Sequence, residues 1–101
     1  MNIKIHSIKF DADQKLIDFI EAKLSKLSQI FDNIVGFEVF LRLENSQTSE
    51  NKITEIRVEI PNNDLFASRQ SKTFEESTAQ CVDALKVQLV RYKEKLRRNK
   101  K

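Results

Sequence analysis

Apolar residues recur with two different periods along this chain of 101 residues, and the change of period limits the folds that it can adopt. Within residues 16–31 and 74–96 they return every three or four positions, which gathers them on one side of a helix. Within residues 37–43 and 56–60 they alternate with polar residues, as in a strand with one buried face. The chain therefore combines helices with strands.

Two weaker segments complete this pattern. Residues 1–10 alternate in part and predict a first strand, and residues 65–70 have the low apolar content that is typical of a strand at a sheet edge. The sequence thus predicts an α+β fold of order β-α-β-β-β-α, a two-layer sandwich in which both helices cover one face of a four-stranded sheet. With 40% apolar residues, we expect a single domain, residues 1–98, followed by a basic tail, residues 99–101.

Polar residues mark where these elements begin and end. Asp13 is placed to cap the first helix, and Thr73 with Glu76 fits a capping box at the start of the second. Pro61 is expected to end the third strand. Residues 45–51 are polar throughout and predict a hairpin loop.

Basic residues concentrate near the C-terminus. Residues 86–101 hold eight lysines and arginines against one acid, whereas the whole chain has a net charge of only +3, so residues 1–85 are net negative. Such a cationic segment attracts phosphate polyanions, which makes a nucleic acid the first candidate partner. Acids early and bases late in one helix also match the helix dipole, and ordinary helix stabilisation remains an alternative for part of this charge.

Little in the sequence points to catalysis or to a membrane. The apolar runs are short and no secretory signal is evident, so we expect a cytoplasmic protein. Cys81, the single cysteine, cannot form an intrachain disulfide, and His6 lies on a strand face without an evident catalytic partner. The single glycine, Gly36, excludes the glycine-rich phosphate loops. We expect no enzyme activity, no metal and no cofactor.

Several segments resemble the ribosome hibernation-promoting factor family, and the likeness extends over nearly the whole chain. The first helix and the segment after it carry Ala22-Lys23-Leu24-Ser25-Lys26-Leu27 and Phe31-Asp32-Asn33-Ile34. The second helix carries Asp83-Ala84-Leu85-Lys86-Val87-Gln88-Leu89 and Lys93-Glu94-Lys95-Leu96. The resemblance rests on the order and spacing of these four segments rather than on any one motif. It implies the short form, similar to ribosome-associated inhibitor and protein Y and to proteins called sigma-54 modulation proteins, without the C-terminal dimerisation domain of the long form.

The resemblance also implies a fold like that of double-stranded-RNA-binding domains and a function at the ribosome. Members of the family bind the small subunit near the decoding region and overlap the mRNA and tRNA paths. We therefore expect this chain, a monomer off the ribosome, to bind 16S rRNA in the 30S subunit and the 70S ribosome. Translation would be inhibited and ribosomes preserved in stressed or stationary bacteria. The resemblance implies neither a membrane nor a small-molecule substrate, and it leaves open whether bound ribosomes pair into dimers.

Eight basic residues are expected to contact ribosomal RNA if the resemblance is carried over position by position. They are Lys23, Lys26, Lys86, Arg91, Lys93, Lys95, Arg97 and Arg98. Contacts of this kind fix position on a phosphate backbone without reading its sequence. Phe19, beside the lysines, is a candidate for stacking on a base, whereas Tyr92 lies on the apolar stripe and is better explained as core.

Two other functions stay open from the sequence. The chain could be a protein-interaction module that uses Phe40 on the polar sheet face or the edge strand 65–70. It could also be a general binder of double-stranded RNA, which would take plain duplexes about as well as ribosomes. The basic residues of the strands, by contrast, are expected to pair with glutamates on neighbouring strands; these are Arg42, Arg57, Arg69 and Lys72.

Overall fold

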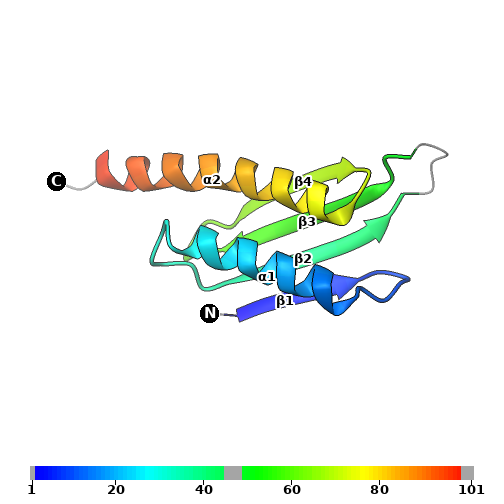
Figure 1. Ribbon diagram of the computed structural model, residues 1–101. Coiled ribbons are helices and arrows are strands. Elements are labelled where there is room, and N and C mark those ends of the chain that lie inside the picture. The colour runs from blue at the N-terminus through cyan, green and yellow to red at the C-terminus, as the bar shows by residue number, and fades with distance from the viewer. Residues whose placement is uncertain (1, 45–48, 99–101) are drawn as a thin grey trace.

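The computed structural model describes residues 2–44 and 49–98, and in them it confirms the expected order of elements (Figure 1). The elements are β1 (Asn2–Ser7), α1 (Gln14–Ser28), β2 (Gly36–Leu43), β3 (Lys52–Glu59), β4 (Leu65–Ser71) and α2 (Phe74–Arg98). Part of the expected hairpin loop, residues 45–48, and the expected basic tail, residues 99–101, lie outside the described residues.

The four strands form one sheet in the order β1-β2-β3-β4. β1 and β2 are parallel and are joined through α1, while β3 and β4 each run antiparallel to the strand before. The register aligns Ile5, Val39, Ile56 and Ala67 in one row across the sheet. Because side chains alternate between the faces of a strand, this row marks the face that the helices cover. Figure 1 shows both helices on that face, as predicted.

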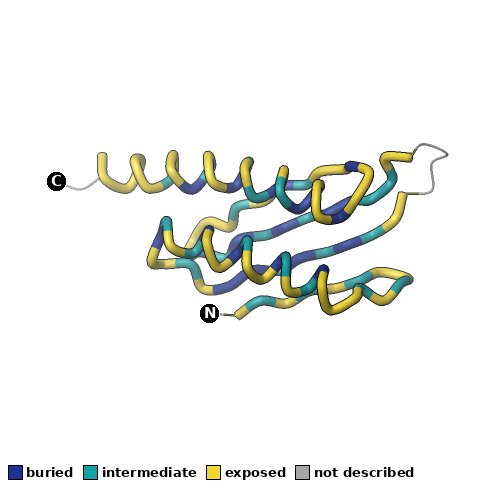
Figure 2. Tube along the Cα trace, in the orientation of Figure 1, coloured by how far each residue is buried: buried dark blue, intermediate teal, exposed yellow. Residues whose placement is uncertain are grey.

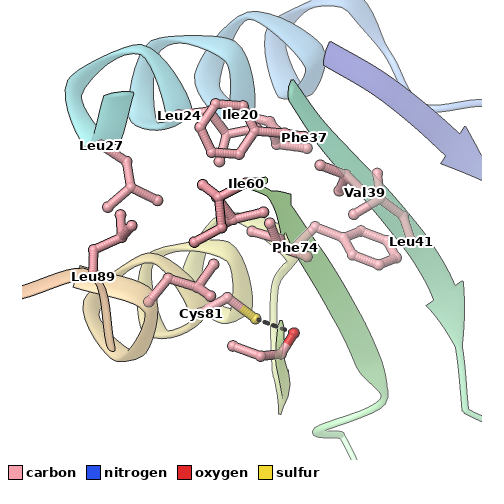
Figure 3. Close-up of a cluster of buried hydrophobic side chains, with 14 of the residues drawn as sticks. Ile20, Leu24, Leu27, Phe37, Val39, Leu41, Ile60, Phe74, Cys81 and Leu89 are labelled. Atoms are coloured by element: carbon pink, nitrogen blue, oxygen red, sulfur yellow. Dashed lines mark hydrogen bonds between the residues drawn. The ribbon is translucent and has the colours of Figure 1, made fainter. Parts of the chain in front are cut away.

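The hydrophobic core lies between the sheet and the two helices (Figure 3). Ile20 and Leu24 of α1 and Leu85 and Leu89 of α2 are fully buried. Figure 3 shows Leu27 of α1 and Leu89 of α2 pointing toward each other, and both side chains are buried. Both side chains belong to the core that joins α1 to α2, and Leu27 also lines the groove described below.

Both predicted capping side chains, Asp13 and Thr73, are in place, and of the predicted capping box the structure shows the half made by Thr73. The Asp13 carboxylate accepts a hydrogen bond from the backbone N–H of Leu16 at 2.9 Å, and the Thr73 hydroxyl accepts one from the N–H of Glu76 at 3.0 Å. These bonds satisfy amides that have no partner within the helix. At its other end α1 is shorter than its apolar pattern, because the helix stops at Ser28 while Phe31 enters the core from the turn that follows.

Gly36 is required where β1 approaches β2. A Cβ atom at this position would lie 2.7 Å from the carbonyl oxygen of Asn2, a backbone atom that cannot move aside without breaking the parallel pairing. The only glycine of the chain therefore serves the sheet rather than a ligand loop.

The uncovered face of the sheet carries paired charges. Arg42 donates to Glu55 at 2.9 Å and Arg57 donates to Glu38, which confirms the cross-strand pairing expected for these two arginines. The same expectation is wrong for Arg69, whose guanidinium donates instead to the carbonyl of Ser68 at 2.7 Å. The reason is that Thr54, not a glutamate, lies opposite Arg69 in the register.

α2 extends past the body of the molecule. Its 25 residues compare with 15 in α1, and its last buried residue is Leu89 (Figure 2). Leu96 continues the buried stripe, yet it is 41% exposed because no strand or helix lies beneath it. The C-terminal turns therefore project from the domain with their basic side chains exposed.

Candidate nucleic-acid interface

A groove between the two helices collects three of the predicted basic residues. Lys23 and Lys26 of α1 and Lys86 of α2 line one hollow of about 280 Å³. Its other lining residues are Leu27, Gln29, Ile30, Val82 and Asp83. The lysines were predicted from two separate helices, and the fold brings them to one place.

The buried stripes of the helices explain this placement. Lys23 and Lys26 each precede a buried leucine of α1, Leu24 and Leu27, and Lys86 follows buried Leu85 on α2. A side chain one position from the stripe lies about 100° around the helix, at the rim of the packed face. The apolar stems can then lie along the groove while the ammonium groups stay in water.

Lys93 extends the basic surface toward the end of α1. Its ammonium donates a hydrogen bond to the carbonyl of Ile30 at 3.0 Å, just beyond the last turn of α1. A cation at this position also interacts favourably with the negative, C-terminal end of the α1 dipole. Arg97 follows Lys93 by four residues on the same helix and therefore shares its side.

The remaining predicted residues of α2 lie on other sides of the helix. Lys95 is two residues after Lys93, about 200° around the axis, and Arg98 is also turned away from the α1 side. Arg91 lines a separate shallow hollow with Val87, Val90 and Glu94. Lys86 also borders this second hollow. The structure thus groups Lys23, Lys26, Lys86, Lys93 and Arg97 on the side that faces α1 and leaves Arg91, Lys95 and Arg98 apart from them.

The groove lysines outnumber the one acid that lines the groove with them, Asp83, and none of them forms an ion pair within residues 2–44 and 49–98. Within the described ranges 2–44 and 49–98, the ion pairs are Arg42–Glu55 and Arg57–Glu38, both on the uncovered face of the sheet, where His6 also contacts Glu38. The helix layer therefore presents free cations, while the opposite face presents charges that cancel. This separation directs an anion to the helices.

Two aromatic residues near the groove differ in their surroundings. The Lys23 ammonium lies 5.5 Å from the ring centroid of half-buried Phe19, within reach of a cation–π contact. Tyr92 packs edge-to-face on Phe31, with ring centroids 5.6 Å apart, and belongs to the rim of the core, as expected.

The other chemically notable residues have structural surroundings. Burial raises the pKa of the Cys81 thiol to about 12, and its Sγ lies 3.1 Å from the carbonyl oxygen of Thr54 as a hydrogen-bond donor. A thiol in this state is a poor nucleophile at neutral pH. His6 Nε2 lies 3.0 Å from Glu38, and its ring stacks on Phe40 at 4.9 Å.

The hydrogen bonds of Arg57 and then of His6 lower the pKa of the Glu38 carboxyl below its ordinary value. Among residues 2–44 and 49–98, no group of three or more metal-binding side chains occurs. No helix in the same ranges is long and apolar enough to span a membrane.

Fold and surface together define a small α+β domain with a basic groove between two helices on one face of a four-stranded sheet. The chain belongs to the family of sigma 54 modulation proteins and S30EA ribosomal proteins, whose sequence profile matches residues 3–97. This membership confirms the resemblance noted in the sequence.

Three known proteins are similar to this chain over nearly its full length. The ribosome hibernation promoting factor of Klebsiella oxytoca is 26% identical over 99 residues, which is 98% of each chain. A ribosomal subunit interface protein from Coxiella burnetii has the same fold, with a TM-score of 0.82, 21% identity, and coverage of 93% of this chain and 99% of that one. The N-terminal domain of Protein Y from Thermus thermophilus superposes with a TM-score of 0.78 at 24% identity, covering 91% and 99%.

Proposed function

We propose that this protein is a ribosome hibernation factor that binds the small ribosomal subunit through the α1–α2 groove. The observation that carries the proposal is the convergence of Lys23, Lys26 and Lys86, without acidic ion-pair partners in the described chain, on the fold of a ribosome-associated family. The name of the Klebsiella oxytoca relative supports the same role.

The proposed ligand is 16S rRNA of the 30S subunit, alone or within the 70S ribosome. Lysine contacts to phosphates release condensed counterions, so binding gains free energy without reading sequence. Selectivity for the ribosome then comes from the folded shape of its RNA, to which two basic helices on a rigid sheet are matched. Occupancy near the decoding region would exclude mRNA and tRNA, which inhibits translation and preserves idle ribosomes.

The eight predicted residues have graded roles in this proposal. Lys23, Lys26 and Lys86 hold phosphates in the groove, and Lys93 and Arg97 extend the contact along the same side of α2. Arg91, Lys95 and Arg98 contribute contacts beyond the groove, or steer the approach through the charge of the projecting helix end. The activity is binding rather than catalysis, by one domain that acts as a monomer in the cytoplasm.

The alternative of a protein-interaction module receives less support from the contacts of the sheet. On the edge strand β4, the carbonyls of Phe66 and Ser68 accept bonds from the side chains of Gln88 and Arg69, at 3.0 and 2.7 Å. An added strand would have to displace both bonds. Phe40 is partly covered by the stacked ring of His6.

Co-sedimentation with purified 30S subunits, 50S subunits and 70S ribosomes tests the proposal. The groove variant replaces Lys23, Lys26 and Lys86 by glutamine. A matched control replaces three exposed lysines outside the groove by glutamine, so that both variants lose the same charge. These lysines are Lys4, Lys9 and Lys72. We expect wild type and control to travel with 30S and 70S particles and the groove variant to stay at the top of the gradient.

Two results would refute the proposal. One is equal binding by both variants, which would assign the interaction to net charge alone. The other is efficient competition by a plain RNA duplex at the same nucleotide concentration, which would favour a general binder of double-stranded RNA.

A further inference from the structure

The groove contains a carboxylate that a purely phosphate-binding surface does not need. Asp83 lies among the lining residues, three positions before Lys86 on α2, and its side chain is exposed. A negative charge beside a bound phosphate repels it. If the groove served phosphates alone, Asp83 would weaken binding.

Helix stability does not account for Asp83 either. It is the tenth residue of α2, well past the first turn, where an acid gains from the helix dipole. Within residues 2–44 and 49–98 it takes part in no ion pair, with Lys86 or with any other cation. Its carboxylate is therefore available as an acceptor for a bound molecule.

We infer that Asp83 accepts a hydrogen bond from a ribose 2′-hydroxyl while the surrounding lysines hold the adjacent phosphates. The inference rests on the proposed function, since the ligand is RNA in both. It assigns Asp83 a different task from the lysines, namely the selection of RNA over DNA. The 2′-hydroxyl is the group that lets a protein make this distinction.

The composition of the groove fits a sugar–phosphate unit. Ile30 and Val82 provide a partly exposed apolar surface on which the C–H face of a ribose can pack. Lys23 and Lys26 come from α1, whereas Asp83 and Lys86 come from α2, so a backbone held in the groove meets cations and the carboxylate together. Because a 2′-hydroxyl is one ribose carbon away from the 3′-phosphate of its own nucleotide, it lies in the groove once that phosphate is bound.

The substitution Asp83→Asn gives opposite results under the two explanations. It removes a negative charge and keeps the shape of the side chain, so simple electrostatics predicts tighter binding. Our inference predicts weaker binding, by roughly tenfold, because a hydrogen bond to a charged acceptor becomes a weaker one. Glu94→Gln is the matched control, since it removes the same charge from the same helix at a position outside the groove.

Two assays measure the effect. The first is the dissociation constant for 30S subunits at fixed salt, with the circular dichroism melting curve of each variant as the check on folding. The second compares fluorescein-labelled oligo(U) with oligo(dU) of the same length at low salt. We expect wild type and Glu94→Gln to prefer the ribose oligomer severalfold, and Asp83→Asn to lose that preference.

The inference and the proposed function can fail separately. Absence of binding to 30S subunits by wild type would refute the proposed function. The oligonucleotide assay would still test whether Asp83 gives the protein a preference for RNA over DNA. The inference itself is overturned if Asp83→Asn binds 30S subunits as tightly as Glu94→Gln or more tightly. It is also overturned if wild type shows no preference for oligo(U), or if Asp83→Asn keeps that preference.

Discussion

The salt dependence of ribosome binding gives a quantitative test of the groove, because it counts the phosphates that the protein neutralises. A plot of the logarithm of the binding constant against the logarithm of salt concentration has a slope of roughly −0.7 to −0.9 per neutralised phosphate. The groove holds three lysines free of ion pairs, Lys23, Lys26 and Lys86. Replacing all three by glutamine should therefore make the slope less steep by roughly 2 to 3 units.

The same numbers give the expected loss of affinity. A fourfold rise in salt weakens each phosphate contact by roughly threefold, so wild type should lose roughly 20- to 40-fold more affinity than the groove variant over that range. Fluorescence anisotropy of labelled protein titrated with 30S subunits at four salt concentrations measures both slopes. The control variant of Lys4, Lys9 and Lys72 should keep the wild-type slope. A groove variant with the wild-type slope would refute the reasoning, since it would mean that these lysines contact no phosphate.

Three further predictions concern stability and protonation. Leu89→Ala should lower the free energy of unfolding by about 2 to 5 kcal/mol in urea titrations, because it removes a fully buried side chain between α2 and α1; a loss well under 1 kcal/mol would contradict the packing. Cys81 should resist alkylation by iodoacetamide in the folded protein. Alkylation at the rate of a free thiol would refute its burial. The pKa of the Cys81 thiol is raised from 9.0 to about 12 in the folded protein, so the thiol loses its proton at a lower pH in the unfolded state than in the folded state. The contribution of the buried thiol to stability is therefore present below pH 9 and declines as the pH rises from 9 to 12. The pKa of the Glu38 carboxyl is lower in the folded protein than its unfolded value of 4.5. The ionised carboxylate therefore stabilises the fold above pH 4.5, and this stabilisation is lost as the pH falls through the folded-state pKa. Arg57→Gln should move the pKa of Glu38 upward in an NMR titration, and an unchanged midpoint would contradict the pairing.

Most of the fold follows from side-chain periodicity and from polar residues at element ends. The caps at Asp13 and Thr73 were predictable because a capping residue acts on amides within its own turn. The end of α1 was not, since Phe31 has the spacing of the helix but reaches the core from a turn. A hydrophobic stripe records which residues are buried, and a helix is only one way to bury them.

The candidate site was predictable within each helix and not between the helices. A rotation of about 100° per residue relates Lys23 to Lys26, and Lys93 to Lys95, from sequence alone. It does not say how α1 is turned against α2, which depends on the packing of Leu27 on Leu89. For this reason the sequence predicted eight basic residues as one set of RNA contacts, whereas the structure separates those that face α1 from those that do not.

Asp83 was missed as a site residue for a related reason. In the sequence it is one more acid in a helix that is acidic early and basic late, so nothing sets it apart from Glu75 and Glu76, whose place in the first turn the dipole explains. Its place between lysines of two elements appears only in three dimensions. An acid that falls among bases predicted to bind phosphate is the signal that could have identified it.

Directed cleavage of ribosomal RNA tests the central claim most directly. Because Cys81 is buried with a raised pKa, a cysteine introduced as Gln29→Cys, at an exposed groove position outside the proposed phosphate contacts, can be labelled alone with an iron chelate that generates hydroxyl radicals. In 30S and 70S particles, we expect cleavage of 16S rRNA along the mRNA and tRNA path near the decoding region, and protection when mRNA and tRNA are bound first. Cleavage elsewhere, or cleavage that persists at full strength when mRNA and tRNA occupy the ribosome, would contradict the account.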